Sequence, residues 1–322
     1  MPTLARCTAL LALAAAPLLA LAQAWPTKPV RLILSSAPGL PPDVLARGLA
    51  QQLQQRYRQP FVVENKPGAN AQIAMQACAA APPDGHTFCV TTNDAVSVNP
   101  HLYTRLPYDA DRSFVPVAIL AYPNSVVVAN SQLGVRTFKD LQAWARQHPG
   151  ALNWGSFGVG SSSHLYMEWI RATTGLDVTH VPFNGPTLVP AVVSNQVQLS
   201  YLAIGALKAH IDSGKLVALA VAGAHRSPFL PQVPTLAEAG MGEFFVRTWF
   251  GLFAPAGTDT GVVNELNKAA LEIVNDRAFR SATMDVLTLT PGSGTPAEVR
   301  EYLQRDRAAG AELVRVAKVK LD

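Results

Sequence analysis

Hydrophobic residues fall into short continuous runs that alternate with longer amphipathic segments. The runs, typical of strands buried on both faces, cover residues 30–35, 61–64, 86–91, 152–154, 178–181, 199–202 and 216–222. The segments between them have apolar residues at helical spacing and predict helices at 43–57, 70–80, around 141–145, 163–173, 187–193, 207–211, 261–275 and 297–314. Repeated strand–helix units predict an α/β fold with parallel sheets and helices on both faces.

Two segments look like crossings between lobes, one near residues 121–124 and one near 242–249. A length of 322 residues suggests about two domains of roughly 150 residues each. We therefore expect a discontinuous first lobe, residues 25–122 and 247–322, and an inserted second lobe, residues 123–246. This layout suits hinge closure around a ligand.

The first 24 residues have the pattern of a secretory signal peptide. Arg6 precedes an apolar run at residues 9–21, and Ala22 and Ala24 provide the small residues that signal peptidase reads. The alternative is a membrane anchor, but this run is shorter than the roughly 20 residues that span a bilayer. We expect export, with cleavage before Trp25.

Charge and cysteine content narrow the class further. The chain carries 26 Lys and Arg against 22 Asp and Glu, scattered with no basic stripe, so nothing supports nucleic-acid binding. Cys78 and Cys89 are the two cysteines that follow the leader, which in an exported protein favours a disulfide over two buried thiols. No His-x-x-x-His or Cys-x-x-Cys motif occurs, so no metal site is expected.

The segment at residues 156–162, Ser-Phe-Gly-Val-Gly-Ser-Ser, lies between a predicted strand and a predicted helix. Backbone N–H groups at a helix N-terminus bind anions, and glycine allows close approach of the backbone. An ordinary N-cap and turn use the same residue types. On the residues alone, both interpretations stay open.

An enzyme is the main rival class. Gly158 and Gly160 resemble part of a dinucleotide-binding fingerprint, but Ser163 replaces the third glycine and Asp177 precedes its strand instead of ending it. The segment at 160–164 resembles a nucleophile elbow without its final glycine. We therefore expect no catalytic residues and no cofactor.

A series of short motifs lies along the chain after the leader. They include Asp-Val-Leu-Ala-Arg at 43–47, Val-Val-Glu-Asn-Lys-Pro-Gly-Ala at 62–69, Pro-Asp-Gly-His-Thr at 83–87, Leu-Pro-Tyr-Asp at 106–109, His-Val-Pro-Phe-Asn-Gly at 180–185, Ala-Glu-Ala-Gly at 237–240 and Ala-Pro-Ala-Gly-Thr at 254–258. In order and spacing, over about 290 residues, these motifs resemble the Bug-type substrate-binding receptors of tripartite tricarboxylate transporters.

The resemblance implies two Rossmann-like lobes with a ligand cleft between them, as in type II periplasmic binding proteins. It implies a periplasmic, monomeric receptor that takes up a small organic acid or amide and delivers it to a separate membrane permease. A sensory protein that presents the ligand to a membrane sensor kinase would share this fold, so that alternative stays open.

The resemblance also suggests a set of ligand-binding residues. They are Ala37, Gly39, Leu40, Asp43, Asn70, Asp94, Phe157, Gly158, Gly160, Ser161, Ser162, Phe183 and Asn184. We expect Asp43 at the cap of the first helix, His180 facing the cleft, and His164 in a packing or capping role.

Several first-lobe positions depart from the family pattern. Leu40, Pro41 and Pro42 stand where relatives carry glycines and a threonine, and Asn70 and Ala71 replace a glycine pair. An acidic residue at position 94 replaces a small neutral one. Prolines lack an N–H group, so we expect a monocarboxylate or an apolar acid, aromatic acids included, in preference to a short dicarboxylate.

Overall fold

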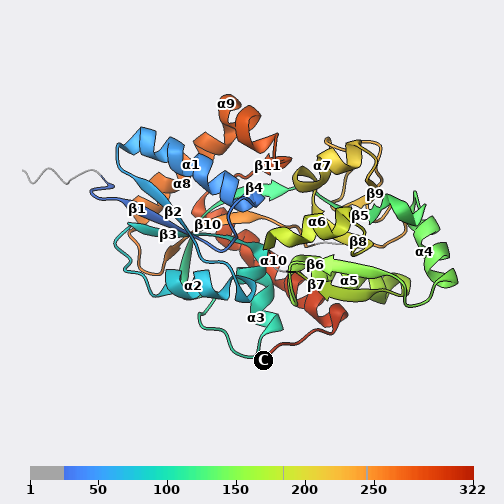
Figure 1. Cartoon of the computed structure of the whole chain (residues 1–322). Helices are drawn as coiled ribbons and strands as arrows, with labels where there is room; N and C mark the ends of the chain where they lie inside the picture. The colour runs from blue at the N-terminus through green and yellow to red at the C-terminus, as the bar shows by residue number, and fades with distance from the viewer. Residues whose placement is uncertain (1–24, 184, 244–245) are drawn as a thin grey trace, which may run out of the picture.

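The computed structural model describes residues 25–183, 185–243 and 246–322. The predicted leader at 1–24 and the candidate residue Asn184 lie outside this part of the chain. The described residues form two β-sheets, each with its own helices, set side by side (Figure 1). None of their helices is long and apolar enough to cross a bilayer.

The first sheet has the strand order β11-β4-β10-β3-β1-β2. Its strands are β1 (Val30–Leu34), β2 (Phe61–Asn65), β3 (Thr87–Thr92), β4 (Phe114–Pro123), β10 (Phe250–Pro255) and β11 (Leu289–Pro291). β1 pairs in parallel with β2 and β3, whereas β10 runs antiparallel to both β3 and β4.

The second sheet has the order β7-β6-β8-β5-β9. Its strands are β5 (Ser125–Asn130), β6 (Asn153–Ser156), β7 (Thr179–Pro182), β8 (Leu199–Ala203) and β9 (Leu216–Val221). β6 is parallel to β7 and β8, but β5 is antiparallel to β8 and β9.

The expectation of parallel sheets was wrong, because both sheets are mixed. β4 and β5, which the hydrophobic pattern left as a connection, pass directly from one sheet to the other with Asn124 between them. β10 returns to the first sheet beside β4. Strands that leave and re-enter a sheet in this way run in opposite directions, whereas parallel neighbours need a crossover connection.

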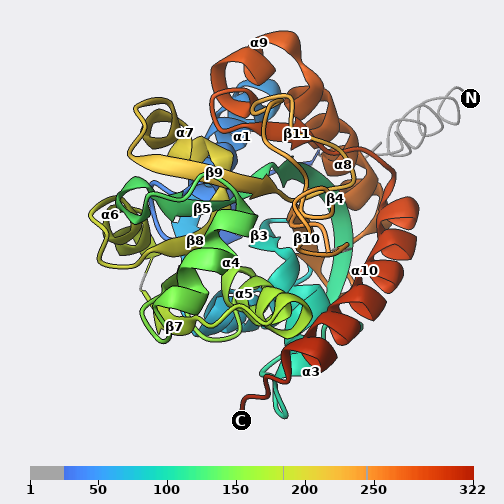
Figure 2. The ribbon, with the colours of Figure 1, turned by 90° about the vertical axis from the view of Figure 1, so that its right-hand side faces the viewer.

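Ten helices named α1–α10 cover the sheets within the described residues (Figure 2). They are α1 (Pro41–Tyr57), α2 (Gln72–Ala79), α3 (Asn99–Leu102), α4 (Phe138–Gln147), α5 (Ser162–Thr174), α6 (Leu188–Val193), α7 (Ile204–Asp212), α8 (Thr260–Asn275), α9 (Arg277–Phe279) and α10 (Pro296–Ala317).

The first helix begins earlier than expected. Its N-cap is Leu40, and Pro41 and Pro42 form its first positions, so Asp43 is inside the helix and not at its cap. The first N–H groups of a helix have no intrahelical partner, so prolines are tolerated there.

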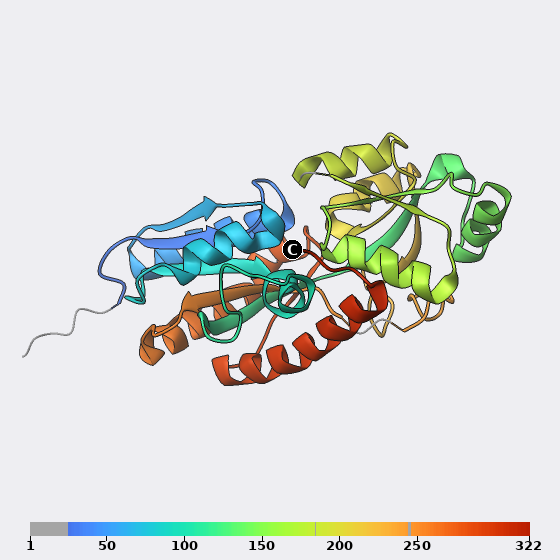
Figure 3. The same cartoon turned by 90° about the horizontal axis from the view of Figure 1, so that it is seen from below.

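The described residues form two hydrophobic clusters around each sheet, and α10 contributes to both lobes. Val299 and Leu303, near the start of α10, pack with first-lobe residues such as Trp249 and Phe253. Farther along, Leu313 and Val314 pack with Trp154 and other second-lobe residues. Figure 3 shows α10, in red, running beneath the first lobe and reaching the second.

The predicted disulfide is confirmed. Cys78 in α2 is bonded to Cys89 in β3, with a Cα–Cα distance of 6.0 Å. Both residues are fully buried. The bridge fastens α2 to the strand that follows it in sequence.

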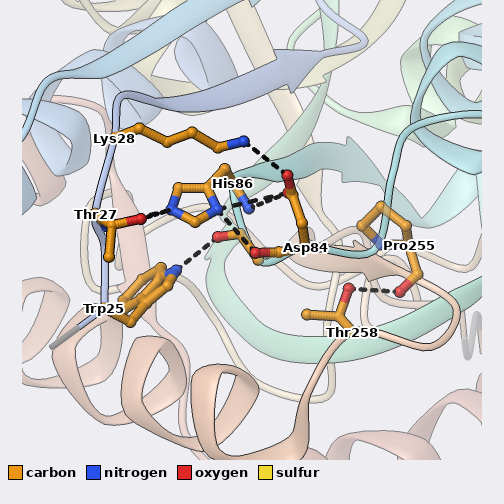
Figure 4. A network of polar contacts seen from close by, with 8 residues as sticks. Trp25, Thr27, Lys28, Asp84, His86, Pro255 and Thr258 are labelled. Carbon is orange, nitrogen blue, oxygen red and sulfur yellow. Dashed lines mark hydrogen bonds and ion pairs between the residues drawn. The ribbon is translucent and has the colours of Figure 1, made fainter. Parts of the chain in front are cut away.

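The first described residues dock onto the turn before β3 (Figure 4). The Trp25 indole N–H donates to the Gly85 carbonyl at 2.7 Å, and Lys28 forms an ion pair with Asp84 at 2.9 Å. Gly85 has φ of +77°, and a Cβ there would lie 3.1 Å from the indole nitrogen. The chain is therefore anchored to the first lobe from Trp25 onward.

Candidate functional site

A cavity of about 710 Å³ lies between the two sheets. The first lobe lines it with segments that follow β1 and β3 and with the turn at 67–71. The second lobe contributes the segment between β6 and α5, residues 185–189, and residues at the end of β8. Ligands of open α/β sheets bind outside the carboxyl ends of the strands, which is where this cavity lies.

A second hollow, of about 330 Å³, lies at the end of α1 around Arg58. It is lined by Gln54, Gln55, Arg58, Gln59 and Pro60, which belong to one lobe only. We therefore take the larger cavity as the candidate site.

Most of the candidate residues line this cavity. Those that do are Ala37, Leu40, Asn70, Asp94, Phe157, Gly158, Ser161 and Ser162. Gly39, Asp43, Gly160 and Phe183 are not among the lining residues. Phe183 instead packs against the second-lobe cluster that contains Leu188 and Val197.

Asp43 lies beneath the cavity wall and holds the loop before α1. Its carboxylate accepts hydrogen bonds from the Gly39 N–H at 2.9 Å, from Arg47 Nε at 3.0 Å and from Asn65 Nδ2 at 2.8 Å. Burial acts to raise the pKa of Asp43, but these donors outweigh it and hold the pKa below its usual value. Asp43 therefore positions the loop that carries Ala37 and Leu40.

The turn at 69–71 adopts an unusual backbone conformation. Ala69, Asn70 and Ala71 have φ values of +46°, +48° and +72°, in the region where glycine is favoured. The glycine pair of the family pattern is absent, but the left-handed conformation remains, at a cost of roughly 1–3 kcal/mol for each such residue. Strain of this kind clusters at ligand sites.

Asn70 links the two lobes across the edge of the cavity. Its Nδ2 donates to Asn99 Oδ1 at 2.7 Å and to the Gly160 carbonyl at 3.1 Å. Gly160 itself has φ of +81°, and a Cβ there would lie 2.4 Å from the Leu102 side chain. The glycine therefore lets the second-lobe segment approach the first lobe closely.

The segment before α5 is held in shape by its own side chains. Ser163 Oγ accepts from the Phe157 N–H at 3.1 Å, and Ser156 Oγ accepts from the Gly158 N–H at 3.1 Å. His164 Nδ1 accepts from the Gly160 N–H at 3.0 Å. The N–H groups of His164 and Leu165 donate to the Ser161 carbonyl, whereas the Ser162 N–H at the start of α5 is directed toward the first lobe.

Asp94 lies at the start of α5, where it accepts hydrogen bonds from Ser162. It belongs to η2 (Asp94–Val98), a first-lobe turn directly after β3, and its side chain lies against the start of α5. The Ser162 N–H donates to Asp94 Oδ2 at 3.3 Å, and the Ser162 hydroxyl donates to Asp94 Oδ1. Burial raises the pKa of Asp94 to about 6, although the hydrogen bonds from Ser162 act to lower it.

His164 and His180 lie behind the cavity. Their rings stack at 3.9 Å, and His180 Nε2 is 2.5 Å from Ser156 Oγ. Neither ring is among the lining groups, so the expected cleft-facing position of His180 is not found, whereas His164 has the packing and hydrogen-bonding role expected of it. Burial, with a smaller effect from His180, lowers the pKa of His164 to about 4.

Several lining residues were not predicted from the sequence. Ser125 and Thr248 stand beside the two lobe crossings, and Tyr201 is the aromatic residue of the apolar run at 199–202. Tyr201 stacks on Tyr166 at 3.7 Å, and burial raises its pKa. The sequence signal that could have indicated these lining residues is a polar side chain inside or beside a buried apolar strand.

The described lining residues of the cavity carry negative charge and no positive charge. Asp94 is the only charged residue among its described lining residues, which include no lysine, arginine or histidine. Much of the wall is apolar, with Leu40, Pro41, Phe157 and Val189 among its members. A bound anion would therefore depend on hydroxyl groups and backbone N–H groups.

Comparison with known proteins identifies the family. The profile of TctC, described as "Tripartite tricarboxylate transporter family receptor", matches residues 45–298. The chain belongs to this receptor family. The Bug-type resemblance drawn from the short motifs is thereby confirmed.

Individual relatives span nearly the whole receptor. BugT of Bordetella pertussis is 33% identical over 304 residues, 93% of this chain and 92% of that protein. The structure of R. palustris Rpa4515 with adipate has a TM-score of 0.86 at 30% identity, covering 92% and 99% of the two chains. The periplasmic binding protein BugD has a TM-score of 0.83 at 28% identity, covering 92% and 99%. The predicted two-lobed receptor fold is confirmed by these likenesses.

Proposed function

We propose that this receptor captures a small organic acid or its amide between its lobes and passes it to a separate membrane permease. The observation that carries the proposal is the cavity of about 710 Å³, which both lobes line and onto which the N-terminus of α5 opens. A volume of this order suits a small ligand. The adipate in the similar Rpa4515 structure supports an organic acid as the ligand class.

We also propose that the receptor has no catalytic activity. The serine–histidine contact that most resembles hydrolase chemistry joins Ser156 to His180, but Ser156 is fully buried and outside the cavity lining. Inside the lining, Asp94 has no second titratable acid or base among the described residues other than tyrosine hydroxyls. A nucleophile needs both access and a base within hydrogen-bond reach.

The cellular setting is part of the same proposal. We propose export to the periplasm with cleavage before Trp25, and a monomeric mature protein. The anchoring of Trp25 and Lys28 to the turn at 84–85 supports a mature chain that starts there. The lobes are proposed to comprise residues 25–122 with 247–322, and residues 123–246.

The test is a binding screen of the mature protein. Thermal shift followed by calorimetry would use succinate, adipate, benzoate and nicotinate, each with its amide. We expect at least one member to raise the melting temperature and to bind with one-to-one stoichiometry, since a ligand that binds only the folded state stabilises it.

Two tryptophan variants in α7 test the position of the binding site, one as the test and one as its control. Ala206 lines the cavity, so Ala206→Trp would fill it and abolish binding. Ala209 is exposed on the same helix and outside the lining, so Ala209→Trp should bind as the parent does. A panel without any binder, or binding that survives in Ala206→Trp, would contradict the proposed site.

A further inference from the structure

The anion position at the start of α5 is already filled by the receptor itself. A helix N-terminus stabilises negative charge because its first N–H groups point outward and the helix dipole is positive there. Here the charge is supplied by Asp94, which receives the Ser162 N–H and the Ser162 hydroxyl across the lobe boundary. An incoming ligand carboxylate would find these donors taken.

Among the described lining residues of the cavity, no cation compensates a second negative charge. Within the described part of the chain, no lysine, arginine or histidine forms an ion pair with Asp94, and none lines the cavity. Asp306, a further buried acid, acts electrostatically on Asp94 from the α10 side. On the protein side, the charged groups near η2 therefore include Asp306 and Arg307, whose Nε donates to the Val96 carbonyl at 2.9 Å. On the cavity side, the described lining residues carry no charge apart from Asp94 itself.

Asp94 retains capacity to accept further hydrogen bonds. An ionised carboxylate has about four acceptor positions, and Ser162 supplies two donors. Asp94 is 9% exposed and belongs to the cavity lining, so it borders the space that a ligand would occupy. A ligand group with an N–H or O–H donor would complete this set.

We propose that Asp94 sets the specificity of the site: it takes the place of one ligand carboxylate, and the receptor selects an organic acid amide or similar ligand with a donor at the Asp94 end. This inference rests on the proposed receptor function and narrows it. The ligand has no more than one carboxylate, placed away from Asp94, and a body that packs on Leu40, Phe157 and Val189. Dicarboxylates of the same length bind more weakly because Asp94 repels their second carboxylate.

The experiment compares matched ligands that differ in one terminal group. Calorimetry at pH 7.5 would measure adipate against its monoamide, adipamate, and succinate against succinamate. For the wild-type receptor we expect at least one monoamide to bind tenfold or more tightly than its diacid. Asp94→Ser removes the charge and frees the α5 donors, so it should gain at least tenfold for that diacid.

Asp94→Asn provides a second variant of nearly the same size, in case the serine leaves a cavity that unfolds the lobe contact. It should also lose the preference for the monoamide. Asp285 is exposed and outside the cavity, so Asp285→Ser is the matched control and should keep the wild-type preference. Far-ultraviolet circular dichroism and melting curves of the unliganded variants verify folding.

The outcomes separate the two proposals. If the wild type binds diacid and monoamide equally, or if both Asp94 variants keep the wild-type ratio, the specificity role is overturned while the receptor function stands. If no acid or amide of the full panel under Proposed function binds the wild type or any Asp94 variant, the proposed ligand class fails and the inference fails with it.

Discussion

At the scale of single residues, the buried titratable groups of His164 and Asp94 lie on opposite sides of the lobe boundary. The Gly160 N–H donates to His164 Nδ1, which requires that nitrogen to be unprotonated. Burial lowers the pKa of His164 to about 4 and raises that of Asp94 to about 6. Both shifts favour the neutral form of a buried group, as expected from desolvation.

These shifts predict opposing effects of pH on stability. Unfolded histidine titrates near 6.5, so the unfolded chain binds an extra proton between about pH 6.5 and 4, and His164 removes stability as pH falls through that window. Asp94 adds stability as pH falls from about 6 to 4, because the folded state binds its proton at higher pH than the unfolded chain does. Each effect is on the order of 3 kcal/mol, so the two largely cancel in the wild type.

Urea unfolding of single variants from pH 7.5 to 4 should separate the two effects. Asp94→Asn should lose stability on acidification more steeply than the wild type, because the opposing contribution of Asp94 is removed. His164→Gln, which keeps an acceptor for Gly160, should be relatively stabilised on acidification. Parallel curves for all three proteins would show that neither group has the proposed shift.

At the scale of elements, the disulfide fastens α2 to β3 across a short turn. Cys78 and Cys89 are 11 residues apart and both are buried. The same turn receives the Trp25 indole, which also packs edge-on against Tyr57, Phe61 and Phe88. The start of the mature chain and the bridge therefore stabilise one corner of the first lobe.

Removal of the bridge should lower the free energy of unfolding. On the chain-entropy account, closure of so short a loop contributes about 3 kcal/mol. The double variant Cys78→Ala, Cys89→Ala should lose about this amount in urea titration, and dithiothreitol should destabilise the wild type but not the variant. Intact mass of the secreted protein after alkylation without reduction checks both the bridge and the start at Trp25; uptake of two alkyl groups would contradict the bridge.

At the scale of the whole molecule, the lobes are joined by chain passages and by a shared helix, in addition to the side-chain contacts of Asn70 and Asp94. The chain passages run from β4 to β5 and from β9 to β10, and the shared helix is α10, which packs against both lobes. Trp249 lies just before β10, and its indole N–H donates to Asp306 of α10 at 2.9 Å. Gly310 of α10 passes so close to η2 that a Cβ there would meet the Ser97 carbonyl.

Ligand binding should close the lobes about these connections, because a small ligand gains most contact when both walls reach it. We expect a smaller radius of gyration by X-ray scattering at saturating ligand, and a change in tryptophan emission from Trp249 at the hinge. Ala206→Trp should show neither response. Scattering profiles that coincide with and without ligand would contradict a large closure.

Much of the fold could be predicted from local patterns. The strands at 30–34, 87–92 and 199–203 and the helices that follow them come from apolar runs and helical spacing, which depend on neighbouring residues only. β4 and β5 were missed although both are apolar. They follow one another without a helix between them, whereas the prediction assumed that strands and helices alternate.

Within the candidate site, residue types predicted which segments line the cavity but not which groups each residue contacts. The glycines and serines at 156–162 marked a helix start that lines the cavity, and the pair of cysteines marked the bridge. Gly160 and Asp43 were named for the ligand, but they fit the lobes together and hold the α1 loop. Sequence could not separate these roles, since the same residue types serve both.

The sequence by itself determined the two-lobed α/β class, the family, the disulfide partners and the segments that line the cleft, because periodicity, cysteine count and motif order are local or additive properties. Only the tertiary structure decided that Asp94 lies on the N-terminus of α5. Asp94 and Ser162 are 68 residues apart and belong to different lobes. Their contact follows from how the two sheets and α10 pack together, and no local pattern specifies that packing.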